Sequence, residues 1–287
     1  MKNICIVANS KTRASSSDVD TIINEVKAHG GTCTLLRDRT DGKASESGES
    51  FIDLSSIPDR AECAIVLGGD GTIIQTARQF AGKHIPILGI NLGTLGFLAD
   101  AERNNIKDTV AALLADKCTV EERLMLSGEV VSCGKVLYES NALNDIVVAR
   151  SGVLRVISTE VSIDENMFGS FRGDGIIVST PTGSTGYNLS AGGPILMPGT
   201  KSIAVTPICP HSFGDRGIVA PCTSEIRIDV VQSKKTQKDE AIVSFDGNRG
   251  IRVNTGDHVL IRKAVETVSF IRTEGYSFLN VLREKMR

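Results

Sequence analysis

Tryptophan is absent from this chain of 287 residues, and aromatic residues of all kinds make up only 4% of it. Proteins that bind single-stranded nucleic acid stack bases on aromatic side chains, so the sequence offers little for such a platform. A basic excess is missing as well, since 32 Lys and Arg residues face 34 Asp and Glu residues for a formal net charge of -2. Neither nucleic acid nor an anionic membrane surface is therefore expected as a partner.

Long hydrophobic runs are missing too. No stretch approaches the roughly 18 apolar residues of a membrane-spanning helix, and the run Ile4–Ala8 is too short for a signal peptide. The seven cysteines are odd in number and include no C-x-x-C pair, which disfavours a disulfide framework and a zinc cage. We therefore expect a cytoplasmic protein with reduced thiols.

Several common catalytic motifs do not occur in the chain. It contains no G-x-x-x-x-G-K-[ST], no G-x-G-x-x-G, no H-E-x-x-H and no G-x-S-x-G. The four histidines lack metal-ligand spacing, and among them only His211 is a candidate for touching a ligand. The chemistry must therefore come from other segments.

Glycine, by contrast, is abundant, with 28 residues where an average composition gives about 20. The length predicts about two domains. Up to about residue 120, apolar runs alternate with segments of helical period, which predicts an α/β domain with a parallel, Rossmann-like sheet. The expected strands are 4–8, 32–36, 64–67 and 85–90, and the expected helices are 19–26, 72–81 and 105–115.

Beyond about residue 120, short β-branched runs between turn residues predict an antiparallel, all-β domain. The expected strands are 129–131, 146–149, 153–161, 175–179, 203–207, 225–231, 241–245 and 259–261. The tail 276–287 regains helical spacing and is expected to pack on the first domain, and the polar segment 37–50 is expected to be a mobile loop. The predicted domains are 1–120, with 265–287 returning to it, and 121–264.

The most specific segment is Gly68-Gly69-Asp70-Gly71-Thr72, between a predicted strand and a predicted helix. Glycines there let backbone N–H groups approach phosphate, which makes Gly68, Gly69, Gly71 and Thr72 candidates for phosphate binding. Asp70 would repel phosphate unless it binds a metal or accepts a proton from an attacking hydroxyl. The simpler alternative is an ordinary helix N-cap. Asp70→Asn is expected to keep the shape and hydrogen bonding of the side chain and to remove its basicity.

Three further segments combine glycine with small polar residues. A second glycine loop, 89–97, follows the next predicted strand and is expected beside the first. Asn144 and Asp145 could hydrogen-bond vicinal ribose hydroxyls, although a polar turn is the simpler interpretation without context. The run 171–194 is dense in Thr, Ser and Gly, which suits a polar nucleotide.

In order and spacing, these segments resemble the bacterial NAD kinase family. The match rests on Gly68–Thr72, Gly93–Phe97, Asn144-Asp145, Thr182–Tyr187 and Ser190–Pro194, and it extends to Pro210–Ser212 and Asp246-Gly247. The first segment is shared with diacylglycerol kinases and phosphofructokinases, whereas the Thr-Gly-Ser-Thr loop before Tyr187 is more specific. The resemblance implies a Rossmann-like domain, a β domain and an NAD site in the cleft between them.

The same resemblance implies an enzyme of the phosphotransferase class with an alcohol acceptor. Its reaction would be ATP-dependent phosphorylation of the 2′-hydroxyl on the adenosine ribose of NAD, with a divalent metal such as Mg²⁺. Asp70 is implied as the proton acceptor. The implied NAD-binding residues are Asp70, Gly71, Phe97, Asn144, Asp145, Arg155, Arg172, Asp174, Thr185, Gly186, Tyr187, Asn188, Leu189 and Ser190. Gly186 departs from the family's usual Ala and gives a roomier loop.

The resemblance further implies a homodimer or homotetramer, because the family's site is completed by a neighbouring subunit. The sequence does not distinguish ATP from polyphosphate as the phosphoryl donor. A lipid or sugar kinase of the same superfamily remains an alternative, as does a non-enzymatic nucleotide-binding sensor.

Overall fold

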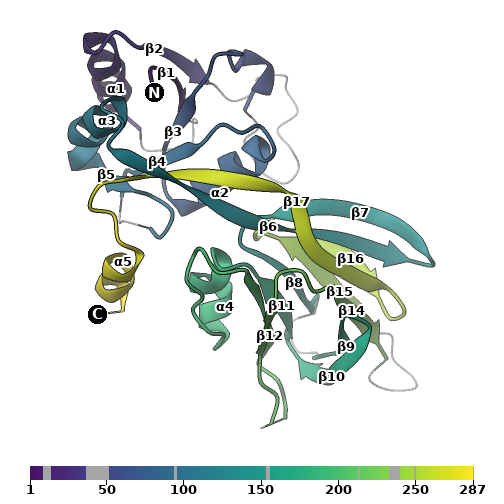
Figure 1. The fold of residues 1–287 in the computed structure, drawn as a ribbon. Coiled ribbons are helices and arrows are strands. Elements are labelled where there is room, and N and C mark those ends of the chain that lie inside the picture. Colours follow the sequence, from purple (N-terminus) through teal and green to yellow (C-terminus); the bar gives the residue numbers. More distant parts are fainter. Residues whose placement is uncertain are drawn as a thin grey trace. The chain divides into compact units, whose positions relative to one another are not determined.

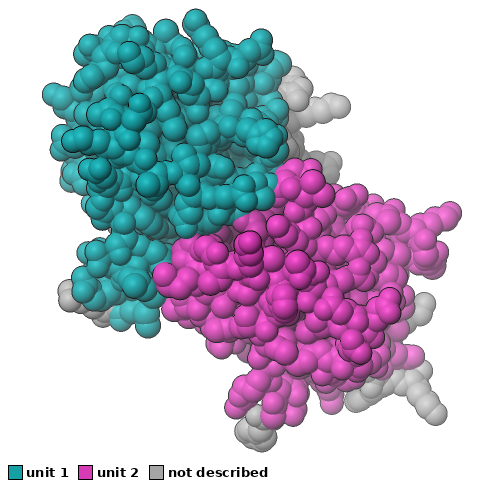
Figure 2. Space-filling view, viewed as in Figure 1, with its two compact units in different colours: residues 1–123, 267–287 teal, residues 124–266 magenta. Residues whose placement is uncertain are grey.

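The computed structural model describes residues 1–8, 14–36, 52–93, 96–152, 156–212, 214–232, 240–248 and 250–286. The chain divides into two compact units, Met1–Arg123 with Thr267–Arg287 as unit 1 and Leu124–Glu266 as unit 2 (Figures 1 and 2). Two long strands, β6 (Cys118–Ser132) and β17 (His258–Thr273), each contribute residues to both units. The segment predicted as a mobile loop, 37–50, lies outside the described residues.

Unit 1 contains a parallel sheet in the order β2-β1-β3-β4, and β5 and β17 each pair parallel with β4. Its strands are β1 (Asn3–Val7), β2 (Thr32–Leu36), β3 (Cys63–Leu67), β4 (Ile87–Asn91) and β5 (Ala101–Glu102). Its helices are α1 (Ser16–Ala28), α2 (Asp70–Phe80), α3 (Ile106–Leu114) and α5 (Phe278–Lys285), with short 3-10 turns at Leu54–Ser56 and Arg103–Asn105. All residues of β3 and β4 are buried, as in parallel strands covered on both faces.

The helices of unit 1 follow from the apolar periods in the sequence. α1 begins at a capping box formed by Ser15 and Asp18 and buries Ile22 and Val26 completely. These side chains join Val110 and other residues of α3 in one core with β1, β3 and β4. The predicted strands and helices of the first domain are therefore confirmed, with bounds that shift by a few residues.

Unit 2 is built from antiparallel strands, and its first sheet has the order β13-β12-β11-β8-β15-β16. In its second sheet, β9 pairs with β10 and β14, β17 pairs with β14 and β6, and β6 pairs with β7. The strands are β7 (Lys135–Ala142), β8 (Asp145–Arg150), β9 (Ile157–Ile163), β10 (Asn166–Gly173), β11 (Gly175–Ser179), β12 (Ser202–Ile208), β13 (Ile218–Pro221), β14 (Ile226–Val231), β15 (Glu240–Phe245) and β16 (Ile251–Asn254). One core joins side chains of both sheets, such as Val148 and Val178 from the first and Val161 and Ile228 from the second.

The predicted fold class is confirmed: a Rossmann-like parallel sheet, an antiparallel β unit and a C-terminal helix in the first unit. The predicted strand 259–261 is only the start of the much longer β17. Sequence patterns missed β5, β7, β10, β13 and β16. Within the described ranges, no helix is long and apolar enough to cross a membrane.

Candidate active site

The Gly-Gly-Asp-Gly segment turns the chain from β3 into α2. A Cβ at Gly68 would lie 2.7 Å from the hydroxyl oxygen of Thr72, so only glycine fits at this close approach. Gly69 is the N-cap residue of α2 and Asp70 is the first residue of the helix. The interpretation of Asp70 as an N-cap is therefore wrong. Space for a Cβ is open at both Gly69 and Gly71, whereas the N–H groups of Gly68 and Thr72 already donate to the carbonyls of Ile90 and Gly69.

The second glycine loop holds the Asp70 carboxylate. The backbone N–H of Phe97 donates to Oδ2 of Asp70 at 2.9 Å, and the N–H of Leu98 donates to Oδ1 at 3.3 Å. Gly96 lies directly against the same carboxylate, because a Cβ there would be 1.9 Å from Oδ1. The expected proximity of the two glycine loops is therefore confirmed.

These contacts correct one sequence-based expectation. Both oxygens of Asp70 accept a backbone N–H, and an asparagine has only one oxygen acceptor. Asp70→Asn therefore cannot keep the hydrogen bonding, since its amide group would face a donor. A carboxylate offers about four lone-pair positions, so two remain for a substrate hydroxyl.

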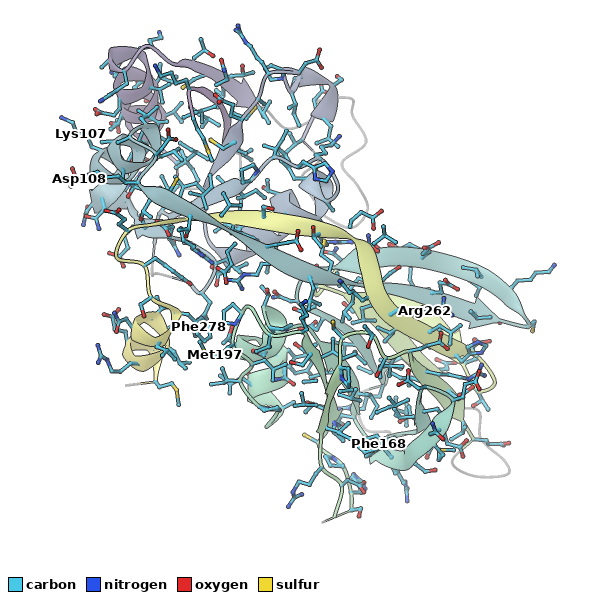
Figure 3. All side chains as sticks on the ribbon, viewed as in Figure 1. Lys107, Asp108, Phe168, Met197, Arg262 and Phe278 are labelled. Atoms are coloured by element: carbon cyan, nitrogen blue, oxygen red, sulfur yellow. The ribbon has the colours of Figure 1, made fainter. Side chains whose placement is uncertain are left out.

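Phe97 was predicted to contact NAD, and its ring lies against the C-terminal helix. The ring centroid is 6.0 Å from that of Phe278 at the start of α5 (Figure 3), and the Lys285 ammonium lies 5.5 Å from the same centroid. The backbone N–H of Phe97 donates to Asp70, while the Phe97 side chain packs against α5. The sequence carried no signal for this second role.

In unit 2, Asp246 holds the turn that contains Asn144 and Asp145. Its carboxylate accepts the backbone N–H groups of Leu143 at 2.8 Å, Asn144 at 2.6 Å and Asp145 at 3.2 Å. Gly183 closes the turn from the other side, because a Cβ there would lie 2.2 Å from the Asn144 carbonyl oxygen. Sequence analysis named Asp246 only as part of the family match and missed this role.

The two polar residues of this turn, Asn144 and Asp145, are half-buried and buried, respectively. Oδ1 of Asn144 is buried and has no hydrogen-bond partner in the part of the chain that the structure describes. A buried acceptor without a partner is unusual and indicates a missing donor. Asp145 is only 6% exposed. Burial, with a smaller contribution from the charge of Asp246, raises the pKa of Asp145 to about 7.

In the segment 182–194, some residues are exposed and others are buried and hold the segment in shape. It forms a 3-10 turn at Gly183–Thr185 and the short helix α4 (Tyr187–Ser190). Gly186, Tyr187, Leu189 and Ser190 are exposed, and Thr185 is half-buried. Asn188 has no exposed surface: it donates to the carbonyls of Ser184 and Pro194 and accepts from the Thr206 hydroxyl at 2.7 Å. The Asn188 side chain therefore supports the segment from within instead of facing a ligand.

Asp174 lies at the opposite end of the sheet from Asp145. Ser179 pairs with Asp145 at one end of β8 and β11, whereas Arg150 ends β8 and pairs with Asp174 through Nε–Oδ1 at 2.6 Å. Sequence analysis did not predict Arg150. Burial first, and then the charges of Asp174, Cys209 and Asp145, raise the pKa of the Tyr187 hydroxyl.

The remaining predicted residues have simpler placements. Arg172 is exposed on β10, and its carbonyl accepts the backbone N–H of His211 at 2.8 Å. Arg155 lies outside the described residues. Among the residues that the structure describes, no group of three or more His, Cys, Asp or Glu side chains could hold a metal ion.

Two family models match the chain. The model of the ATP-NAD kinase N-terminal domain matches residues 20–118, and that of the ATP-NAD kinase C-terminal domain matches residues 143–273. Together they cover both glycine loops, the Asn144-Asp145 turn and the segment 182–194.

Curated relatives named NAD kinase are similar over the full length. That of Lachnoclostridium phytofermentans is 43% identical over 287 residues, which is 99% of each chain. That of Lachnospira eligens is 36% identical over 295 residues, covering all of both chains.

Two solved structures have the same fold at low sequence identity. An NAD kinase from Archaeoglobus fulgidus in complex with ATP has a TM-score of 0.74 at 24% identity, with 100% of this chain and 99% of that chain covered. Yeast NADH kinase complexed with NADH has a TM-score of 0.78 at 24% identity, with 99% and 86% covered.

Proposed function

The chain belongs to the NAD kinase family, and from this premise we propose which of its residues carry out the reaction. It is an NAD kinase: it binds NAD and ATP and phosphorylates the 2′-hydroxyl of the adenosine ribose to give NADP. The comparisons do not favour a lipid kinase, a sugar kinase or a non-enzymatic sensor.

Asp70 acts as the proton acceptor for the ribose 2′-hydroxyl. The observation that carries this assignment is the carboxylate held by two backbone N–H groups at the first residue of α2. Those two bonds fix its orientation and leave lone pairs to accept a proton. Phosphoryl transfer depends mainly on such positioning, since the protein forms no covalent bond to the transferred group.

The phosphates of ATP bind at the start of α2. Gly68, Gly69, Gly71 and Thr72 form the turn, and the open space above Gly69 and Gly71 lets phosphate oxygens reach backbone N–H groups. A divalent metal such as Mg²⁺ would be held mainly by the ATP phosphates, since Mg²⁺ is usually bound by substrate phosphates with one or two carboxylates rather than by a full cage of side chains. When bound, it offsets charge on the transferred phosphoryl group.

Most of the residues that we propose for NAD binding belong to unit 2. Asn144 and Asp145 hold the adenosine ribose, because the unpartnered Oδ1 of Asn144 and the buried Asp145 carboxyl supply acceptors for vicinal hydroxyls. Further contacts come from the exposed backbone and side chains of the segment 185–190, from Gly71 and from Arg172 and Asp174. Asn188 keeps that segment in shape from the inside. Arg150 orients Asp174 through their ion pair.

The test is a coupled assay of Asp70→Asn and Asp70→Ala with ATP, Mg²⁺ and NAD, read out by an NADP-specific dehydrogenase. We expect kcat to fall by about 10²–10⁴-fold in both variants, the usual contribution of a general base. NAD affinity, measured by calorimetry, should change far less. Thermal unfolding of both variants checks for the loss of the Phe97 and Leu98 hydrogen bonds.

The outcomes separate three roles for Asp70. Near-normal kcat in either variant contradicts the proton-acceptor role. A much larger loss in Asp70→Ala than in Asp70→Asn assigns the effect to hydrogen bonding. Parallel losses of kcat and NAD affinity make Asp70 a binding residue.

A further inference from the structure

The backbone at Phe97 and Leu98 is hydrogen-bonded on two sides. Its N–H groups donate to the two oxygens of Asp70. On the other side, the Phe97 carbonyl accepts the hydroxyl of Tyr276 at 3.3 Å, and the Leu98 carbonyl accepts Nη1 of Arg272 at 2.9 Å. The catalytic carboxylate is thus connected, through the backbone of Phe97 and Leu98, to two side chains that lie 179 and 174 residues further along the chain from these residues.

One peptide group carries the connection most directly. The Phe97 carbonyl and the Leu98 N–H belong to the same planar, trans peptide, in which the two groups point in opposite directions. Tyr276 therefore holds one end of this peptide while Asp70 Oδ1 holds the other. A hydrogen bond to the carbonyl also strengthens the bond that the N–H donates.

Arg272 is fixed in place from several directions. It is only 5% exposed, its guanidinium lies 4.0 Å from the centre of the Tyr276 ring, and its Nε donates to Glu121 at 3.3 Å. Thr273, the next residue, donates its backbone N–H to Asp100 at 3.1 Å, which ties the end of β17 to the segment that follows Leu98. Arg272 and Tyr276 therefore support each other.

We propose that Arg272 and Tyr276 are positioning residues, which orient the backbone at Phe97 and Leu98 so that its two N–H groups hold Asp70 for proton acceptance. This inference rests on the proposed role of Asp70. Without the two donors, the peptides are free to tilt, and the carboxylate loses its defined direction. Neither side chain needs to touch NAD or ATP for this effect.

The first experiment is steady-state kinetics of the full chain with Tyr276→Phe, which removes the hydroxyl and keeps the ring beneath Arg272. We expect kcat to fall about 3- to 10-fold, the equivalent of one neutral hydrogen bond. The KM values for NAD and ATP should stay within about twofold, because a positioning role affects the reacting state more than binding. Tyr138→Phe is the matched control: this tyrosine of β7 packs its ring on Phe245 and should keep wild-type kcat.

The second experiment repeats Tyr276→Phe in an Asp70→Ala background. If Tyr276 acts through Asp70, it has no carboxylate left to orient, and the residual kcat should change less than about 1.5-fold. Arg272→Lys provides an independent variant, since a single ammonium cannot hold both Glu121 and the Leu98 carbonyl. Its kcat should fall at least as far as that of Tyr276→Phe.

The outcomes distinguish this inference from the proposed function. Unchanged kcat in Tyr276→Phe, or an equal loss with and without Asp70, overturns the positioning role while leaving Asp70 as the proton acceptor. Near-normal kcat in Asp70→Ala overturns the proposed function and this inference together. A loss in kcat that disappears in the Asp70→Ala background supports both.

Discussion

Single residues in this protein are constrained by what lies against them more than by their own preferences. Gly96 has space for no side chain, because the Asp70 carboxylate occupies the position of its Cβ. Asp145 is held in a buried turn beside the Asp246 carboxylate, which favours its protonated form. Both constraints arise at close contact and can be tested by changing a few atoms.

Gly96→Ala should displace the Asp70 carboxylate and lower kcat by about 10- to 100-fold, since a shift of about 1 Å in a catalytic group can cost that much. The reason is the 1.9 Å separation between a Cβ at this position and Oδ1 of Asp70. Gly93→Ala in the same loop is the matched control, because its Cβ would lie 3.8 Å from the nearest heavy atom. Equal kcat values for the two variants in the coupled assay would contradict the prediction.

Asp145→Asn should remove a pH dependence of stability. The pKa of this aspartate is near 3.9 in an unfolded chain and about 7 in the folded protein. Between these values the folded protein holds the additional proton, so stability decreases as pH rises through this window. The variant lacks this titration. From about pH 5 to pH 8, the free energy of unfolding of the wild type should therefore fall by on the order of 2 kcal/mol relative to that of the variant.

Urea unfolding at the two pH values measures this difference. Asp20→Asn, on the exposed face of α1, is the control for loss of one carboxylate and should follow the wild type. A parallel pH dependence in Asp145→Asn and the wild type would rule out the raised pKa.

At the scale of elements, the functional segments are held by the ends of neighbouring strands. β15 ends at Phe245, and Asp246 directly after it accepts three backbone N–H groups at the start of β8. β3 ends at the first glycine loop, and Phe97 in the loop after β4 donates a hydrogen bond to Asp70 of that first loop. Each site segment therefore depends on a strand that is adjacent in the sheet.

Asp246→Asn should weaken NAD binding and lower stability together. An asparagine offers one oxygen to three donors, and the loss of a charge-assisted hydrogen bond costs about 1.5–3 kcal/mol. NAD affinity measured by calorimetry should fall about tenfold, whereas ATP affinity should hold.

The matched control for this variant is Asp164→Asn. Asp164 is also a turn aspartate with positive φ, 49° against 53° for Asp246, and it accepts the backbone N–H of Glu225 at 2.8 Å. The Asp164→Asn variant should lose some stability and keep the NAD affinity of the wild type. Equal losses of NAD affinity in both variants would show that the Asn144-Asp145 turn does not need Asp246.

At the scale of the whole molecule, we expect self-association. Strand β7 pairs only with β6 among the described strands, and its Val136 and Leu137 are 54% and 58% exposed. An exposed apolar edge strand is a common place for a second chain to attach. The protein should therefore sediment as a dimer or tetramer at assay concentration. Leu137→Lys should shift the distribution toward smaller species, and a fully active monomer of the wild type would refute this prediction.

The sequence by itself determined the fold class, and it supplied the candidate site residues, whose roles stay predictions. Buried parallel strands are continuous apolar runs in the sequence, and these runs predict β1, β3 and β4. The five missed strands, β5, β7, β10, β13 and β16, each pair with a single described neighbour and so lie at sheet edges. Edge strands keep one side in solvent and need no strict apolar pattern, so their sequences carry little that predicts a strand.

Only the tertiary structure decided how the site residues are held. The bonds from Phe97 to Asp70, from Asn144 to Asp246 and from Tyr276 to Phe97 join residues 27, 102 and 179 positions apart. Strand pairing and β17's return to unit 1 create these contacts, and no local pattern encodes them. The same reason places Asn188 inside its segment, where its Oδ1 accepts the hydroxyl of Thr206 from β12. Local sequence selects which chemical groups are present, and packing between distant segments fixes their direction and protonation.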